Sequence, residues 1–258
     1  MGRQFGKIYD ESGNAIQMEP YVIILARHGQ PKWDSNGIGI DEPELTEKGR
    51  RQAEALGECL SRLPITDFYV SSLLRARLTA APLAERIGRE PTVAPWYREI
   101  AAKNLDGYTT DEVKAYYEAW WKLPPAQRFD GPEGGETLAQ IYDRVAGGID
   151  KVLLDAGFSF TGEGRDRTWK LPPEPRCVVL VGHTFASSTA LCHLLNLEYT
   201  GISGEQFRMG WGAYNKLVVF PAGGGYVWRL AELNSCGHLR ARGLIDDDIP
   251  TFEQDCLY

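Results

Sequence analysis

Two short apolar runs have the pattern of central strands in a parallel sheet. Residues 21–26 (YVIILA) and 177–181 (CVVLV) are continuous and rich in β-branched residues, which is typical of strands covered on both faces. Residues 68–71 suit a third strand. Residues 214–220 and 226–233, separated by a turn rich in Pro and Gly, predict a hairpin, which we expect at an edge of the sheet.

In the segments between these strands, apolar residues recur at the spacing of a helix. Thr46 is a good N-cap for a helix with an apolar stripe at Ala53, Leu56, Leu60 and Leu63. A second stripe runs from Leu138 to Val152, and a third helix is expected directly after His183. This alternation predicts an α/β fold, an open and mostly parallel sheet with helices on both faces.

The sequence predicts one domain with an extension at each end. We expect residues 1–20 to be an N-terminal extension, residues 21–238 the domain, and residues 239–258 a loosely held C-terminal tail. Within the domain, residues 101–136 are rich in Tyr, Trp and Pro, and we expect them to form a helical and loop cover over the C-terminal ends of the strands. Residues 157–176 contain several Gly and Arg residues and are expected to form a long inserted surface loop.

Composition excludes several classes of protein. The 258 residues, 43% hydrophobic and 24% charged, are typical of a globular chain with a substantial core, not of a disordered one. A net charge of −7 argues against a dedicated nucleic-acid-binding protein but allows an anionic substrate. No apolar run reaches the roughly 20 residues of a membrane helix, and residues 1–20 lack the pattern of a signal peptide. We therefore expect a cytoplasmic protein without nucleic-acid or membrane partners.

The cysteines and histidines do not form metal-binding patterns. Five cysteines are dispersed without a Cys-x-x-Cys pair, which favours reduced thiols over a disulfide framework. The four histidines are also far apart, so we expect no metal site and no cofactor. The sequence leaves homo-oligomerisation open.

Polar residues follow both apolar runs. The first run leads into Arg27-His28-Gly29-Gln30, and the second into Gly182-His183-Thr184. Since ligands of open α/β sheets bind at the carboxyl ends of strands, we expect both histidines in one cleft. Arg75 would join them from the first turn of a helix, whose N-terminus also favours an anion, whereas Arg77 is expected to be solvated. Arginine pairs well with phosphate oxygens, so the group predicts a pocket for a phosphoryl group.

In their order along residues 21–238, these segments resemble the histidine phosphatase superfamily, which includes phosphoglycerate mutases. The motifs that carry the resemblance are Arg27-His28-Gly29, Leu45-Thr46-Glu47-Lys48-Gly49, Ser72-x-Leu-x-Arg75-Ala76-x-x-Thr79-Ala80, Arg98-Glu99-Ile100 and His183. The resemblance implies the phosphoglycerate-mutase-like fold and a reaction through phosphohistidine that needs no metal.

The resemblance also implies a role for each site residue. His28 would be the nucleophile that attacks phosphorus. Glu99 would protonate the leaving alkoxide and then accept a proton from water. The residues expected to hold phosphate oxygens are Arg27, Arg75, His183, Thr184 and Gln30, with His183 also taking part in catalysis. We therefore predict a phosphatase whose substrate is a small phosphorylated metabolite.

Three positions depart from the family pattern. Asp34 stands where the family often has Asn, and we expect its carboxylate to point away from phosphate or to pair with Lys32. Thr184 replaces a usual Gly and adds a side chain at the pocket. Lys103 also replaces a usual Gly, and adds positive charge that suits a substrate with a second anionic group. The segment Glu133–Thr137 is interpreted as a helix start rather than a substrate contact.

Two alternatives remain open at this level. One is a cofactor-dependent phosphoglycerate mutase, which must shield phosphohistidine from water and hold a bisphosphate. The other is a phospho-ligand-binding domain of the same fold with weak catalysis. The second alternative is opposed by the joint presence of Arg27, His28, Arg75, Glu99 and His183, while Asp34 and Thr184 leave it open.

Overall fold

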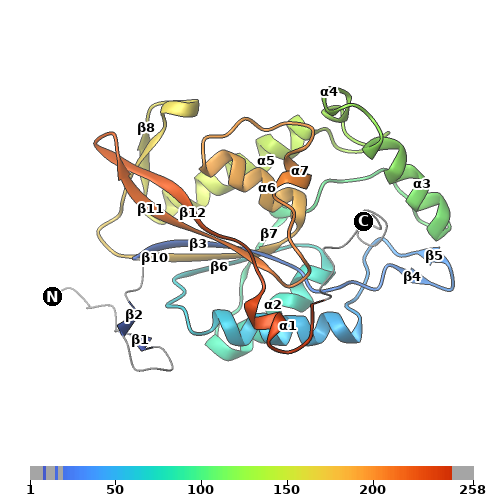
Figure 1. Cartoon of the computed structure of the whole chain (residues 1–258), viewed down its shortest axis with the longest axis horizontal. Coiled ribbons are helices and arrows are strands. Elements are labelled where there is room, and N and C mark those ends of the chain that lie inside the picture. Colours follow the sequence, from blue (N-terminus) through green and yellow to red (C-terminus); the bar gives the residue numbers. More distant parts are fainter. Residues whose placement is uncertain (1–7, 10–14, 17–19, 246–258) are drawn as a thin grey trace.

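An eight-stranded sheet forms the centre of the computed structural model, which describes residues 8–9, 15–16 and 20–245 (Figure 1). Its strands are β3 (Tyr21–Arg27), β6 (Asp67–Ser71), β7 (Thr92–Ala94), β8 (Ser159–Thr161), β9 (Thr168–Lys170), β10 (Arg176–Gly182), β11 (Tyr214–Ala222) and β12 (Gly225–Ser235). Their spatial order is β7-β6-β10-β3-β11-β12-β9-β8. The first four strands are parallel to one another, and the other pairings are antiparallel.

Helices cover both faces of this sheet, as predicted. The helices are α1 (Glu47–Leu60), α2 (Leu74–Ile87), α3 (Thr110–Trp121), α4 (Pro125–Arg128), α5 (Leu138–Asp155), α6 (Thr184–Leu194), α7 (Ser203–Gln206) and α8 (Gly237–Arg240), with 3₁₀ turns η1 (Pro95–Tyr97) and η2 (Gly164–Asp166). Figure 1 shows α1 and α2 below the sheet, and α5 and α6 above it. The predicted α/β class is confirmed, with a sheet that is mixed overall.

The side chains of β3 show why an unbroken apolar run forms this central strand. Val22 and Ile24 pack in a core shared with α1 and α2, whereas Ile23 and Leu25 pack in a core shared with α5 and α6. All four side chains are buried. Burial of each stabilises the fold by roughly 1.5–3 kcal/mol. Successive side chains of a strand point to opposite faces, so both sets must be apolar when both faces are covered.

Local capping sets the starts of two predicted helices. The Thr46 hydroxyl accepts a hydrogen bond from the Gly49 backbone N–H and begins α1. Thr137 begins α5 through a capping box with Gln140, which confirms that Glu133–Thr137 leads into a helix. Leu63 lies beyond the end of α1 but still packs against the same core.

Two expectations about the edge of the sheet are wrong. The β11–β12 hairpin forms, but it lies inside the sheet because β11 pairs with β3 and β12 pairs with β9. Residues 157–176 are not simply a surface loop, since they contain β8 and β9, which add two strands beyond β12. The physical reason is apolar burial: Phe158 and Trp169 are 3% and 1% exposed. The sequence around these two residues is rich in Gly and Arg, and β8 and β9 have only three residues each, so the sequence pattern does not indicate strands.

The charged part of this insertion is also more ordered than expected. The Arg167 guanidinium lies 3.0 Å from an Asp150 oxygen of α5. It also lies over the Phe160 ring, 4.3 Å from the ring centroid. These contacts anchor the β8–β9 hairpin on α5. Arg77, by contrast, is exposed as predicted.

The two predicted extensions are only partly described. In the N-terminal one, β1 (Ile8–Tyr9) pairs with β2 (Ala15–Ile16). At the other end, residues 239–245 are not loosely held, because Leu239 and Leu244 are buried and the Gln52 side-chain amide donates to the Leu244 carbonyl at 3.0 Å. Residues 246–258 of the expected tail lie outside the described residues. No helix in the described ranges is long and apolar enough to cross a membrane.

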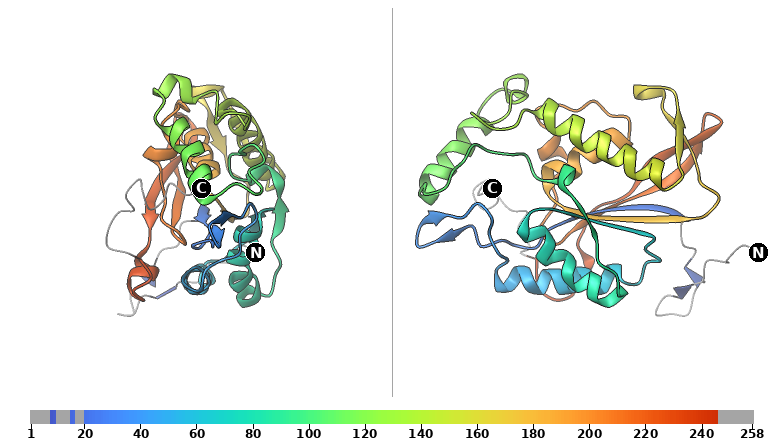
Figure 2. Two further views of the ribbon diagram at one scale, coloured as in Figure 1. Left: turned by 90° about the vertical axis from the view of Figure 1, so that its right-hand side faces the viewer. Right: turned by 180° about the vertical axis from the view of Figure 1, so that it is seen from behind.

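The cover expected over residues 101–136 contains α3 and α4. The loop before α3 hydrogen-bonds to the hairpin of β4 (Asp34–Ser35) and β5 (Ile38–Gly39). Gly39 donates to the Tyr108 carbonyl at 3.1 Å, and Thr110 donates to the Gly37 carbonyl at 2.9 Å. Figure 2 shows α3 and the β4–β5 hairpin at the same end of the molecule.

Candidate active site

The parallel strands bring two histidines to neighbouring strand ends. His28 follows β3 and His183 follows β10, and these strands pair with Arg27 opposite Gly182. The centroids of the two imidazole rings are 5.1 Å apart. Ser71 ends β6 on the other side of β10. The structure therefore places the two histidines side by side. It adds Ser71, which no sequence motif marks although it also ends a strand.

Glycine allows the loop around His28 to pack closely against α1. A Cβ atom on Gly29 would lie 2.4 Å from the Gly49 carbonyl oxygen, which is too close for any side chain. The Gly29 backbone N–H donates to the Thr79 hydroxyl at 3.0 Å, and that hydroxyl donates to the Arg75 carbonyl at 2.7 Å. One threonine thus connects the His28 loop to the helix that carries Arg75.

A backbone carbonyl holds the His28 ring in one tautomer. Its Nδ1 lies 2.8 Å from the Gly29 carbonyl oxygen. Because that oxygen can only accept, Nδ1 carries the hydrogen, and Nε2 of the neutral ring keeps its lone pair. The side chain is 2% exposed. Burial lowers the pKa of His28 well below its ordinary value, and the charges of Arg75 and Arg27 lower it further.

His183 is held in the same buried region. Its Nε2 lies 2.8 Å from the Ser71 hydroxyl, and burial lowers its pKa well below the ordinary value, followed by the charges of Arg75 and His28. Three buried polar atoms here have no hydrogen-bond partner within residues 20–245: His183 Nδ1, Thr184 Oγ1 and Arg75 Nε. A buried polar atom without a partner is costly, so these atoms are available to a ligand.

Two arginines supply the positive charge of the site. Arg27 and Arg75 are 4% and 6% exposed. The Arg27 guanidinium donates to the Met209 carbonyl oxygen and lies 5.5 Å from the centroid of the Trp211 ring. The Arg75 guanidinium lies 5.0 Å from the centroid of the Trp33 ring. Burial lowers the pKa of Arg75, but an arginine remains protonated at any working pH. The site is therefore strongly positive.

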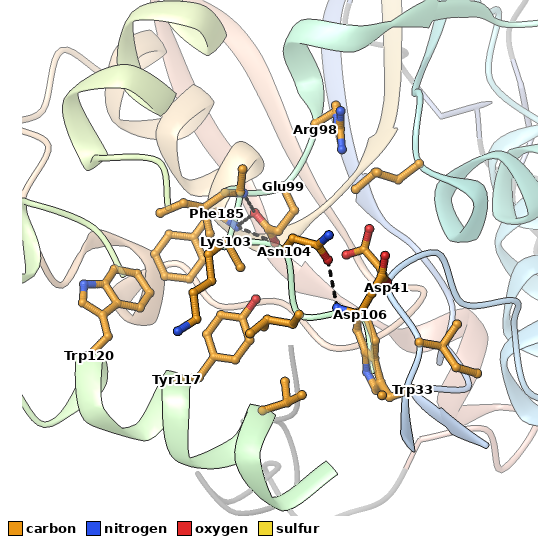
Figure 3. Close-up of a pocket in the computed structure, with 18 of the residues that line it drawn as sticks. Trp33, Asp41, Arg98, Glu99, Lys103, Asn104, Asp106, Tyr117, Trp120 and Phe185 are labelled. Carbon is orange, nitrogen blue, oxygen red and sulfur yellow. Dashed lines mark hydrogen bonds between the residues drawn. The ribbon is translucent and has the colours of Figure 1, made fainter. Parts of the chain in front are cut away.

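Glu99 binds the N-terminus of α6 (Figure 3). Its carboxylate accepts hydrogen bonds from the backbone N–H groups of Phe185 at 3.1 and 3.2 Å, Ala186 at 3.3 Å and Ile100 at 3.0 Å. The positive end of a helix dipole favours a carboxylate there. Burial has the larger effect and raises the pKa of Glu99, against the opposing effect of these hydrogen bonds and Arg75. A raised pKa suits a group that must donate a proton.

Arg144 of α5 fixes the loop that presents Glu99. Its guanidinium donates to the carbonyl oxygens of Trp96 at 2.8 Å, Arg98 at 2.9 Å and Glu99 at 3.0 Å. It also pairs with both carboxylate oxygens of Glu136, each at 2.6 Å. No sequence motif marks Arg144, because the carbonyl groups that it binds are main-chain atoms, which any residue type carries.

Two further residues predicted to bind phosphate, Gln30 and Thr184, lie in different surroundings. The Gln30 side-chain oxygen accepts a hydrogen bond from the Thr46 hydroxyl at 2.9 Å, so part of this side chain serves to hold α1. Thr184 is the first residue of α6 and is buried. Phosphate binding by these two residues stays a prediction. Asp34 lies in β4, and the expected orientation of its carboxylate is also untested.

A pocket of about 390 Å³ opens above this centre (Figure 3). Arg75 and Glu99 line it, together with residues 98–106 and one side of α3. His28 and His183 are buried beside Arg75 and are not part of the lining. Within the described residues, no group of three or more His, Cys, Asp or Glu side chains is placed to hold a metal ion. Of the charged groups described above, the Arg75 guanidinium and the Glu99 carboxyl group, whose pKa is raised, face the pocket.

Comparisons with known proteins agree with this geometry. The family model described as histidine phosphatase superfamily (branch 1) matches residues 23–231. The chain belongs to the histidine phosphatase superfamily. Phosphoserine phosphatase 1 of Hydrogenobacter thermophilus is 31% identical over 182 residues, which cover 68% of this chain and 77% of that protein. The chain is accordingly a phosphoric monoester hydrolase with the predicted fold.

Two further comparisons show the range of this superfamily. A probable phosphoglycerate mutase of Erwinia tasmaniensis is 30% identical over 138 residues, covering 51% of this chain and 62% of that protein. The structure of mycobacterial glucosyl-3-phosphoglycerate phosphatase in complex with VO₃ superposes with a TM-score of 0.65 at 26% identity. That superposition covers 83% of this chain and 99% of the mycobacterial one.

Proposed function

We propose that this chain is a metal-independent phosphatase that hydrolyses a small phosphorylated metabolite through a phosphohistidine at His28. The observation that carries the proposal is the hydrogen bond from His28 Nδ1 to the Gly29 carbonyl, because it leaves Nε2 as the nucleophilic atom. Arg75 and His183 lie beside this imidazole, where they are suited to hold the oxygens of a phosphoryl group.

In the first step, His28 Nε2 forms a bond to phosphorus as the bond between phosphorus and the alcohol oxygen breaks. Arg27 and Arg75 stabilise the negative charge on the phosphoryl oxygens. The departing oxygen takes a proton from the Glu99 carboxyl, whose raised pKa keeps that proton available. The products are the free alcohol and phosphohistidine.

In the second step, a water molecule attacks the same phosphorus. Glu99, now a carboxylate, accepts a proton from that water. The bond between phosphorus and Nε2 breaks, inorganic phosphate leaves, and His28 returns to its neutral form. The hydrogen bond to Gly29 keeps the same ring nitrogen free for the next cycle.

The experiment is hydrolysis of a generic aryl phosphate in the presence of a metal chelator, with wild type compared with His28→Ala and Glu99→Gln. We expect chelator-insensitive phosphate release that His28→Ala abolishes. Brief reaction with radiolabelled substrate, followed by acid and alkali treatment, should reveal a label that acid removes and alkali leaves, as expected for phosphohistidine. Activity that survives His28→Ala would contradict the proposed nucleophile.

Phosphoglycerate mutase activity is the second candidate, favoured by the similarity to a probable mutase. A mutase must transfer the phosphoryl group from phosphohistidine back to a phosphoglycerate rather than to water. Interconversion of 3-phosphoglycerate and 2-phosphoglycerate that depends on a bisphosphate primer and exceeds phosphate release would establish this activity. Release of phosphate without interconversion would establish the phosphatase.

A further inference from the structure

The pocket is larger than a phosphoryl group requires. Its volume of about 390 Å³ falls within the roughly 300–1,000 Å³ typical of sites for organic ligands. Figure 3 shows Arg98 and Glu99 on one side of the pocket and α3 on the opposite side. The space between them is available to the alcohol part of a substrate whose phosphoryl group lies at Arg75.

An aromatic wall, formed by Tyr117, Trp120, Trp121 and Phe185, lines the side of the pocket toward α3. Its rings pack against one another: the centroids of Trp120 and Phe185 are 5.6 Å apart, and Tyr117 stacks on Trp121 at 5.6 Å. The Trp120 indole N–H donates to the Arg128 carbonyl at 3.0 Å, so its polar atom is already satisfied. A packed wall of this kind favours a flat apolar group.

Lys103 brings a positive charge to the same pocket. Its ammonium group lies 4.9 Å from the centroid of the Tyr116 ring and 5.7 Å from that of Tyr108. Aromatic rings orient an ammonium group without neutralising it. In the part of the chain that the structure describes, Lys103 forms no ion pair with a carboxylate, and its charge is available to a ligand.

Charge is distributed unevenly around the pocket. Asp41 and Asp106 line it as well, and Figure 3 shows both on the side away from Lys103, near Trp33. Carboxylates repel an anionic substituent and Lys103 attracts it, so the uneven distribution specifies where such a substituent binds. A ligand with its phosphoryl group at Arg75 would place a second anion on the Lys103 side.

We propose that the substrate is a phosphomonoester whose alcohol carries a flat apolar ring and, on that ring, a second anionic group. The ring packs against the aromatic wall, and the anion pairs with Lys103. The inference rests on the proposed function, because it assumes that the phosphoryl group reaches His28. A short phosphorylated acid such as phosphoserine would leave the aromatic wall uncovered.

Four esters of primary alcohols test this inference, chosen so that their leaving groups are similarly reactive: 4-carboxybenzyl phosphate, benzyl phosphate, ethyl phosphate and phosphoserine. For the wild type, kcat/KM should decrease from the carboxybenzyl to the benzyl and then to the ethyl ester, and the carboxybenzyl ester should exceed phosphoserine. Each ester is also measured with His28→Ala to show that hydrolysis occurs at the proposed site.

Two variants separate the parts of the proposed subsite. Lys103→Met should lower kcat/KM for 4-carboxybenzyl phosphate about tenfold more than for benzyl phosphate, since a hydrogen bond to a charged group is lost. Lys103→Gln should give the same difference. Tyr117→Leu should lower kcat/KM for benzyl phosphate more than for ethyl phosphate. Lys122→Met is the matched control, because Lys122 lies at the end of α3, is exposed and pairs with Glu118.

The possible results distinguish the inference from the proposed function. Equal kcat/KM values for benzyl and ethyl phosphate, or equal losses on both benzyl esters in Lys103→Met, would overturn the inference. His28-dependent hydrolysis would still support the proposed function in that case. If the wild type hydrolysed none of the four esters but still released phosphate from the aryl phosphate in a His28-dependent reaction, the inference would be overturned and the proposed function would stand; no release from any of these esters would overturn both.

Discussion

The carboxylate of Glu99 accepts hydrogen bonds from the Phe185 backbone N–H through both oxygens, at 3.1 and 3.2 Å. This relationship joins the loop after η1 to the start of α6, one residue beyond Thr184. The N-terminus of α6 thus holds the expected proton donor, and its Phe185 and Ala186 N–H groups already donate to Glu99. The proposed proton-transfer group therefore comes from the loop after η1, whereas the proposed phosphate-binding groups Arg27 and Arg75 come from β3 and α2.

Activity should depend on pH through Glu99 and His28. Formation of phosphohistidine needs Glu99 protonated, so its rate should fall as pH rises through the raised pKa of this carboxyl group. It also needs His28 neutral, and the lowered pKa of His28 should preserve activity well below pH 6.5. Burst kinetics with an alkyl phosphate between pH 4 and pH 9 measure both limbs.

Glu99→Gln should remove the alkaline limb and lower the rate by about 10²–10⁴-fold, the usual contribution of a general acid. An aryl ester with a good leaving group should lose much less, because its oxygen needs no proton. A Glu99→Gln variant that retains the wild-type alkaline limb would show that another group donates the proton.

Stability should decrease on acidification because of the two buried histidines. Unfolded histidines have the ordinary pKa near 6.5, whereas the pKa of His28 and of His183 is lower in the folded protein. Below pH 6.5 the unfolded chain therefore binds more protons, and each histidine removes about 1.4 kcal/mol of unfolding free energy per pH unit until its folded pKa is reached. Urea unfolding from pH 5 to pH 8 measures this slope. His28→Gln and His183→Gln should each reduce it; an unchanged slope in both would contradict the assignment.

Arg144→Ala should lower kcat by about ten- to 100-fold, because small displacements of a catalytic group are costly. Without the hydrogen bonds from Arg144, the Glu99 loop should admit water. The pKa of Glu99 should then return toward its ordinary value, and the alkaline limb of the pH profile should move to lower pH. Arg167→Ala is the matched control: Arg167, like Arg144, pairs with a carboxylate, here that of Asp150 in α5, but it lies in the inserted hairpin. It should reduce stability and leave the pH profile in place; a similar shift in both variants would indicate a general structural effect.

Thr79→Val should lower both stability and kcat. It leaves the Gly29 N–H without its acceptor, at a cost of about 1–3 kcal/mol, and removes the connection between the His28 loop and Arg75. Thr79→Ser keeps the hydroxyl and should stay close to the wild type. Thermal unfolding and steady-state kinetics measure stability and kcat for both variants. Equal stability and equal kcat in Thr79→Val and Thr79→Ser would contradict the proposed role of the hydroxyl group.

The structural features predicted best are those that depend on residues adjacent in the sequence. The apolar run at residues 21–26 implies a strand covered on both faces, so the position of His28 at its end follows directly. The N-cap role of Thr46 is equally local. The sequence is sufficient to predict the position of a residue when that position depends only on a short segment and on the rule that ligands bind at strand ends.

The features that were missed depend on contacts between distant segments. Arg144 is one of several arginines in the sequence, and only the fold shows that three carbonyl groups of one loop surround it. Trp169 resembles a residue of a loop until β9 pairs with β12 and buries it. Three-residue strands carry too little periodicity to be recognised without their partners.

The register of β3 and β10 has a consequence for how the site withstands thermal motion. The 5.1 Å between the two imidazole rings is close to the roughly 4.8 Å that separates neighbouring strands in any sheet. The main-chain ladder therefore sets how far apart the two histidines begin, and the hydrogen bonds of His28 to Gly29 and of His183 to Ser71 fix the rings. Substitutions in the cores above and below can weaken the protein as a whole while the surviving folded molecules keep the two imidazoles at their working separation.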